Sequence, residues 1–237
     1  MVLMMSSAAA TLAHPGRWGR SPALKPAVFA LCLVPFAELL LRVAGLGLWG
    51  SLGANPVESI IRFSGDWAIR MLLVALAVTP VRELTGLQWL AKLRRMLGLF
   101  AFFYAVVHVL AYVGMDQLFA WGRIWADIVK RNYITVGMAS FVVLAALAAT
   151  SPKRMVKALG GRRWQRLHKT VYAAGALAVL HYAMMVKADL TQPLIHAAIL
   201  TALLAARPLL SLRNRRGKRP AGRQGSQKGD PKLVHRS

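Results

Sequence analysis

Six long blocks of apolar residues, separated by basic loops, dominate this 237-residue sequence. A soluble domain that is 57% hydrophobic would alternate apolar and polar residues along its helices or strands, but here each block is nearly continuous. Each block approaches the ~17–25 residues that a helix needs to cross a bilayer. We therefore predict an all-α, polytopic membrane bundle of about six helices, with spans at 27–48, 67–82, 97–115, 134–150, 170–187 and 193–210.

The formal charge of +23 is spread unevenly over the loops. Most of the 31 Lys and Arg residues lie in the N-terminal tail, in the loops after the second and fourth spans, and in the C-terminal tail. By the positive-inside rule these segments face the cytoplasm, which places both termini there. The charge thus indicates topology and attraction to anionic lipid, and it does not indicate nucleic-acid binding.

The charge and the apolar blocks predict one membrane domain, residues 26–211, between two polar tails. Residues 1–25 are rich in Ala, Ser, Pro and Gly, and residues 212–237 are dominated by basic residues, Gly and Gln, so we expect disordered cytoplasmic tails. Neither tail can supply the βαβ sheet and phosphate-binding loop of a flavin- or nicotinamide-binding module. Cys32 is the single cysteine, so no disulfide within the chain and no CxxCH attachment site for a c-type haem is expected.

Two histidines, His108 and His181, lie inside apolar spans at matched depth. At ~1.5 Å of rise per residue, they lie about 18 Å and about 20 Å from the cytoplasmic ends of the third and fifth spans. Two imidazoles at one depth on separate helices can be the axial ligands of one b-type haem. The alternative is that each is a hydrogen-bonded packing residue.

Small neighbours accompany both histidines and would leave room for a flat macrocycle, although helix packing would explain them equally well. They are Ala101, Ala105 and Ala111 on the third span, and Ala174 and Ala178 on the fifth.

His168 lies thirteen residues before His181, near the cytoplasmic face. That spacing suits a second, stacked haem, but the third span has Arg94 and Arg95 at the corresponding positions. His168 is therefore a candidate ligand of a second haem with an unusual or absent sixth ligand, a contact for a flavin or quinone headgroup, or a helix cap. Arg94 and Arg95 are candidate partners of haem propionates, or positive-inside anchors.

Two further features are open to structural and functional interpretations. Glu38 and Arg42, four residues apart in the first span, should face one another as an intramembrane ion pair. Such a pair either has a functional role or is a structural solution in which two charges neutralise each other. The segment Met115–Tyr133 is expected to form an amphipathic interfacial helix on the outer leaflet, serving as an aromatic anchor or as a docking surface.

A series of short motifs makes the chain resemble a known family. In chain order these are LGANPV (52–57), FSGDWAIRMLL (63–73), TPVR (79–82), RRMLGLFAFFYAVVH (94–108), KRNYITVG (130–137), LGGRRWQRLHKTVY (159–172), LHY (180–182) and QPL (192–194). The chain is similar to the MsrQ (YedZ) family of haem-binding membrane subunits within the ferric-reductase-like transmembrane superfamily. The similarity runs from about Gly47 to Arg207.

The resemblance implies an electron conduit in the bacterial inner membrane with b-type haem, one or two per chain, at His108, His168 and His181. Its acceptor would be the periplasmic molybdopterin enzyme MsrP, which reduces methionine sulfoxide in oxidised proteins. Its donor would be the quinone pool, and FMN and a cytosolic flavin reductase are also associated with the family. Glu38 and Arg42 depart from the family pattern and leave any quinone site undefined.

Several alternatives remain at this stage. A stand-alone ferric reductase would share the bundle, but the missing flavin/nicotinamide module argues against it. A transporter using histidines without haem would favour broken helices, and no Pro or Gly-Gly pair lies within three residues of His108 or His181. A non-redox assembly factor for the periplasmic enzyme is a third. In the electron-conduit interpretation the chain is an electron-transfer subunit of an oxidoreductase system, without a self-contained substrate site.

Overall fold

Helices make up the regular structure of the computed structural model, which describes residues 22–47, 50–186 and 188–217. Within these ranges no strand occurs. The predicted tails, 1–25 and 212–237, lie largely outside the described residues. The elements are α2 (Leu24–Val43), α3 (Pro56–Thr85), η1 (Gln88–Lys92), α4 (Arg94–Leu110), η2 (Ala111–Asp116), α5 (Trp121–Lys130), α6 (Asn132–Ala149), α7 (Lys153–Leu159), α8 (Gly161–His168), α9 (Val171–Met185) and α10 (Thr191–Gly217).

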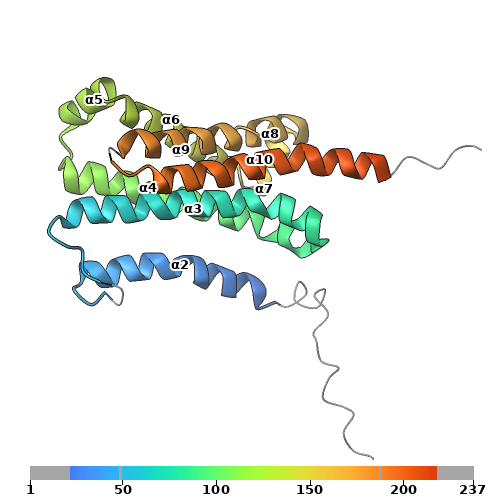
Figure 1. The fold of residues 1–237 in the computed structure, drawn as a ribbon, viewed down its shortest axis with the longest axis horizontal. Coiled ribbons are helices and arrows are strands. Elements are labelled where there is room, and N and C mark those ends of the chain that lie inside the picture. The colour runs from blue at the N-terminus through green and yellow to red at the C-terminus, as the bar shows by residue number, and fades with distance from the viewer. Residues whose placement is uncertain (1–21, 48–49, 187, 218–237) are drawn as a thin grey trace, which may run out of the picture.

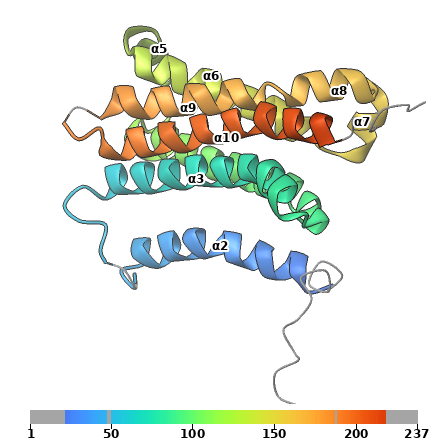
Figure 2. The same cartoon turned by 45° about the vertical axis from the view of Figure 1, so that its right-hand side comes forward.

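The long helices α2, α3, α4, α6, α9 and α10 run side by side along one axis (Figures 1 and 2). In both views α5 lies at one end of this bundle, and α7 and α8 lie at the other. Four helical segments of the described chain are long and apolar enough to cross a membrane: Leu24–Val43, Arg94–Asp116, Asn132–Ala149 and Thr191–Leu210. The all-α membrane bundle is confirmed, whereas the count of six spans stays a prediction, because α3 and α9 are not among these four.

The second predicted span, 67–82, lies within a longer helix, α3. α3 begins at Pro56, where the Asn55 side chain accepts a hydrogen bond from the Glu58 backbone N–H at 3.3 Å. The charged residues in its first half interrupt the apolar block, but the helix pairs them four residues apart, as in Glu58–Arg62 at 2.7 Å. Helix α3 ends at Thr85, and its C-cap residue Gly86 has a φ of 73°, which suits glycine.

The first predicted span, 27–48, extended too far. α2 ends at Val43, and Gly45 has a φ of 75°, so residues 44–47 lie outside the helix. The predicted amphipathic segment Met115–Tyr133 does contain a helix, the shorter α5.

Helix α2 is held to α4 by the hydroxyl of Tyr104, a fully buried side chain. Tyr104 donates to the Cys32 carbonyl at 2.7 Å and accepts from the Phe36 N–H at 3.1 Å. In a regular helix that N–H and that carbonyl would bond each other, so the hydroxyl is inserted into the helical ladder beside Pro35.

Removing this hydroxyl should destabilise the bundle. Tyr104→Phe leaves a buried N–H and carbonyl with poorer partners, which costs about 1–3 kcal/mol and lowers the thermal midpoint in detergent. Tyr133→Phe is the control, since the Tyr133 hydroxyl bonds the exposed Arg131 side chain at 3.1 Å. Equal midpoints for the two variants would show that the inserted hydroxyl contributes nothing.

Candidate functional site

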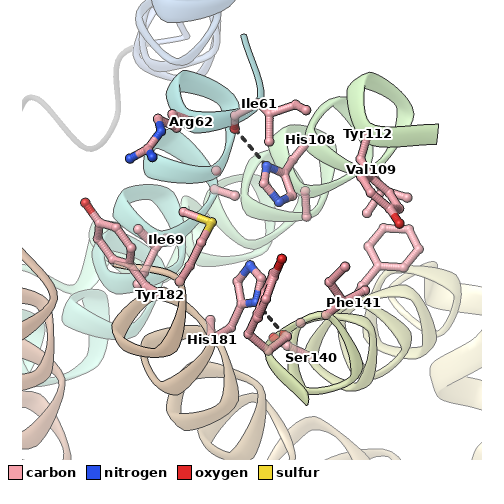
Figure 3. Close-up of a pocket in the computed structure, with 18 of the residues that line it drawn as sticks. Ile61, Arg62, Ile69, His108, Val109, Tyr112, Ser140, Phe141, His181 and Tyr182 are labelled. Carbon is pink, nitrogen blue, oxygen red and sulfur yellow. Dashed lines mark hydrogen bonds between the residues drawn. The ribbon is translucent and has the colours of Figure 1, made fainter. Parts of the chain in front are cut away.

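Two histidines, His108 and His181, meet across a cavity inside the bundle. His108 comes from α4 and His181 from α9, and their ring centroids lie 6.2 Å apart with the ring planes at 79°. Figure 3 shows the two rings pointing toward one another into the open space. The expectation that they share one depth is therefore confirmed.

Each imidazole is held by the backbone of a neighbouring helix. The Nδ1 of His108 lies 2.8 Å from the Ile61 carbonyl of α3, and the Nδ1 of His181 lies 2.7 Å from the Tyr133 carbonyl of α6. A carbonyl oxygen only accepts hydrogen bonds, so Nδ1 must carry the proton in both rings. The Nε2 lone pair is then free to bind a metal, as in other histidine ligands fixed through the second nitrogen.

The space between the rings is a cavity of about 550 Å³. Its volume falls within the ~300–1,000 Å³ of ordinary cofactor pockets. Apolar side chains from four helices form much of the wall, among them Ile69, Leu72, Ala105, Met138, Phe141, Leu144 and Ala178. Such a wall suits a flat, largely apolar group.

The spacing of the rings fits one metal ion between them. Two metal–nitrogen bonds of ~2.0–2.1 Å, plus ~1.1 Å from each nitrogen to its ring centre, give ~6.3 Å between centroids. The observed separation is 6.2 Å. Among the described residues no group of three or more His, Cys, Asp or Glu side chains could hold a metal ion. The donor set therefore suits haem, whose porphyrin supplies the other ligands, better than a bare divalent cation.

Charged side chains gather at one end of the cavity. Glu58, Arg62, Asp116 and Arg131 line it where α3 and α6 begin and η2 ends, and Asp66 lies farther along α3. Two of them are fixed by carboxylates four residues earlier: Arg62 lies 2.7 Å from Glu58, and Arg131 lies 3.1 Å from Asp127. Arginines at the mouth of an apolar cavity can hold the carboxylates of a bound group.

Similarity to known proteins agrees with this geometry. The family described as "Ferric reductase like transmembrane component" matches residues 64–192, which include both histidines. The protein-methionine-sulfoxide reductase heme-binding subunit MsrQ of Rhodospirillum rubrum is 53% identical over 193 residues, covering 81% of this chain and 91% of that protein. The chain belongs to the MsrQ family.

Further relatives extend the similarity. The MsrQ subunit of Polaromonas naphthalenivorans is 45% identical over 202 residues, covering 84% of this chain and 90% of its own length. The magnetosome protein MamZ of Magnetospirillum gryphiswaldense is 44% identical over 182 residues, which cover 76% of this chain but only 28% of MamZ. An MsrQ-like membrane domain thus also occurs within a much larger protein.

The other predicted site residues lie away from this cavity. Arg94 and Arg95 begin α4 and do not line it. His168 ends α8, where its Nε2 lies 3.2 Å from the Thr150 hydroxyl and its ring stacks on Trp164 at 4.0 Å. The pKa of His168 lies below its ordinary value, because burial and then the charge of Arg94 disfavour the protonated ring. The role of His168 as a haem ligand in this MsrQ-family chain stays a prediction.

Some of the alanines near the histidines leave room in the cavity, and the others pack helices together. Ala105 and Ala178 line the cavity. Ala101, Ala111 and Ala174 are buried in helix packing instead. His196, which the sequence left outside the site, is buried and has its Nδ1 2.7 Å from the Gln192 carbonyl, as expected of a packing histidine.

Other site features were missed from the sequence. The backbone carbonyls of Ile61 and Tyr133, and the arginines Arg62 and Arg131, had no assigned role. Directly after α4 the chain forms the π-helical turn η2, so the helix is irregular three residues beyond His108 although no Pro or Gly-Gly pair is present. Such π-helical turns are frequent at functional sites.

Proposed function

We propose that this protein is a b-type haem subunit that carries electrons across the bacterial inner membrane to a periplasmic MsrP-type methionine-sulfoxide reductase. The observation that carries the proposal is the pair of imidazoles facing each other across the cavity, each with Nδ1 bonded to a backbone carbonyl. The heme-binding subunit named in the relatives' descriptions supports it.

In this proposal the Nε2 atoms of His108 and His181 would hold the haem iron, and the apolar wall would keep water away from it. Bound haem supplies one-electron redox chemistry at iron. The chain provides ligands, their orientation, and charges that set the potential, and no side chain has to act as acid, base or nucleophile. This agrees with a role as an electron-transfer subunit without a substrate site of its own.

The charged end of the cavity is proposed to face the periplasm. It lies beside α5, in the basic-poor part of the chain, and the positive-inside rule puts this side outside. The haem would then lie close to a docked acceptor. Electrons would enter from quinol or from a cytosolic flavin reductase, with FMN as a further carrier, at the end that holds Arg94, Arg95 and His168.

Arg131 and Arg62 are proposed to hold the haem carboxylates at the outer mouth. Arg131→Gln should lower the haem midpoint potential, because removing a nearby positive charge favours the oxidised form. For a largely exposed arginine the change is at most about 1 kcal/mol, on the order of 40 mV for one electron.

Arg123→Gln is the matched control in a redox titration. Arg123 lies in α5, at the same end of the bundle as Arg131, but it does not line the cavity. Its side chain donates to the Gln117 carbonyl at 3.0 Å. Equal midpoint potentials for the two variants would contradict the proposal that Arg131 holds the haem carboxylates.

Reoxidation of the reduced protein tests the proposed acceptor. With a catalytic amount of a periplasmic molybdopterin methionine-sulfoxide reductase, we expect the reduced haem bands to decay completely only when methionine sulfoxide is also present as the two-electron acceptor. A parallel sample receives a ferric chelate instead. Decay with the chelate alone, at the same or greater rate, would favour a stand-alone ferric reductase and contradict the proposal.

A further inference from the structure

The two halves of the site repeat one arrangement that involves a glycine. His108 bonds the carbonyl of Ile61, and Gly65 follows four residues later on α3. His181 bonds the carbonyl of Tyr133, and Gly137 follows four residues later on α6. The same spacing on two separate helix pairs indicates a common structural requirement.

That requirement follows from helix geometry. A carbonyl in an α-helix already accepts the N–H of the residue four positions later, so its second lone pair serves any outside donor. A ring that reaches this oxygen lies against the residue at that later position. In both halves of the site the residue is glycine.

A side chain at either glycine would meet the imidazole. A Cβ on Gly65 would lie 3.0 Å from Nδ1 and 3.1 Å from Cε1 of His108. A Cβ on Gly137 would lie 2.8 Å from Nδ1 and 2.9 Å from Cε1 of His181. These distances are shorter than normal carbon–nitrogen and carbon–carbon contacts, so the ring would have to move away from its carbonyl.

We propose that Gly65 and Gly137 are positioning residues for the two imidazoles. By lacking a side chain, each lets its histidine keep the Nδ1–H bond to the carbonyl, which orients Nε2 into the cavity and makes the imidazole a more basic ligand. This inference rests on the proposed haem function, because its consequence is a change in ligand strength.

The test compares Gly65→Ala and Gly137→Ala with two control glycines. A Cβ on Gly98 of α4 would meet nothing within 4 Å. A Cβ on Gly175 of α9 would approach the flexible side-chain tips of Leu200 at 3.3 Å and Leu76 at 3.6 Å, so it reports the effect of ordinary tight packing. Haem per chain, the midpoint potential and the low-spin electron paramagnetic resonance (EPR) signal are measured in isolated membranes, with chain quantified by an epitope tag.

We expect Gly65→Ala and Gly137→Ala to raise the midpoint potential and shift the low-spin signal, or to lower haem per chain several-fold, because a less basic or displaced ligand stabilises ferric iron less. Gly98→Ala and Gly175→Ala should match the wild type. The inference is overturned if Gly65→Ala and Gly137→Ala match the controls in haem content, potential and signal. It is also overturned if neither of these two proteins accumulates in the membrane while Gly175→Ala does, since the glycines would then serve folding alone. A wild-type protein without haem would instead refute the proposed function itself.

Discussion

Replacing His108 or His181 with alanine should reduce bound haem to near zero in the purified protein. Each variant removes one of the two imidazoles that would hold the iron, and no other described histidine or cysteine lines the cavity to replace it. A remaining imidazole would have to hold the group alone, in a wall that is otherwise largely apolar. The measurement is the reduced-minus-oxidised absorption spectrum together with haem quantified per chain.

His196→Gln is the control for this comparison. His196 is also a buried histidine, but it bonds the Gln192 carbonyl of its own helix and does not line the cavity. We expect it to keep wild-type haem content. His168→Ala should also keep the absorption bands of the cavity haem. A loss of haem per chain in this variant would indicate a second haem at the other end of the bundle. Persistence of full haem content in both cavity variants would refute the assigned ligands.

Removing the cation of the Glu38–Arg42 pair should cause the largest loss of stability. The Glu38 side chain is only 3% exposed, and its Oε1 lies 2.8 Å from Nε of Arg42, which also lies over the Phe63 ring. Breaking a buried ion pair from one side typically costs about 3–5 kcal/mol. Arg42→Leu should therefore lower the thermal midpoint in detergent by an amount on the order of 10 °C.

The double variant Glu38→Leu/Arg42→Leu separates the charge effect from the loss of packing. Replacing both members of a buried pair with apolar residues is often neutral or stabilising, so the double variant should recover most of the midpoint lost by Arg42→Leu. A double variant that is as unstable as the single one would assign the loss to packing against Phe63, and the ion-pair explanation would fail.

The histidine pair was predictable from the sequence because helical rise converts residue number into depth. Two continuous apolar spans fix the depth of His108 and His181, and the 6.2 Å between their rings confirms the estimate. The extent of α3 was not predictable from hydrophobicity, because Glu58, Arg62 and Asp66 look like loop residues in the sequence. In the structure all three lie in the helix and line the cavity, and Glu58 pairs with Arg62.

The glycine and carbonyl partners could not be inferred from spacing. His108 bonds a carbonyl 47 residues away, and His181 bonds one 48 residues away, so the contacts depend on which helices pack together. Gly65 and Gly137 occur within recognisable motifs, but a motif does not state which ring lies against them. Only the packing of α3 on α4 and of α6 on α9 brings these groups together.

The most direct test of the central claim is the EPR spectrum of the oxidised, purified protein. Two neutral imidazoles bound through Nε2 predict low-spin ferric haem. The two ring planes lie at 79° to one another in this structure, and imidazoles that kept this orientation while holding the iron would give a strongly anisotropic signal with a large maximal g value. A dominant high-spin ferric signal, or a protein that takes up no haem, would contradict the account.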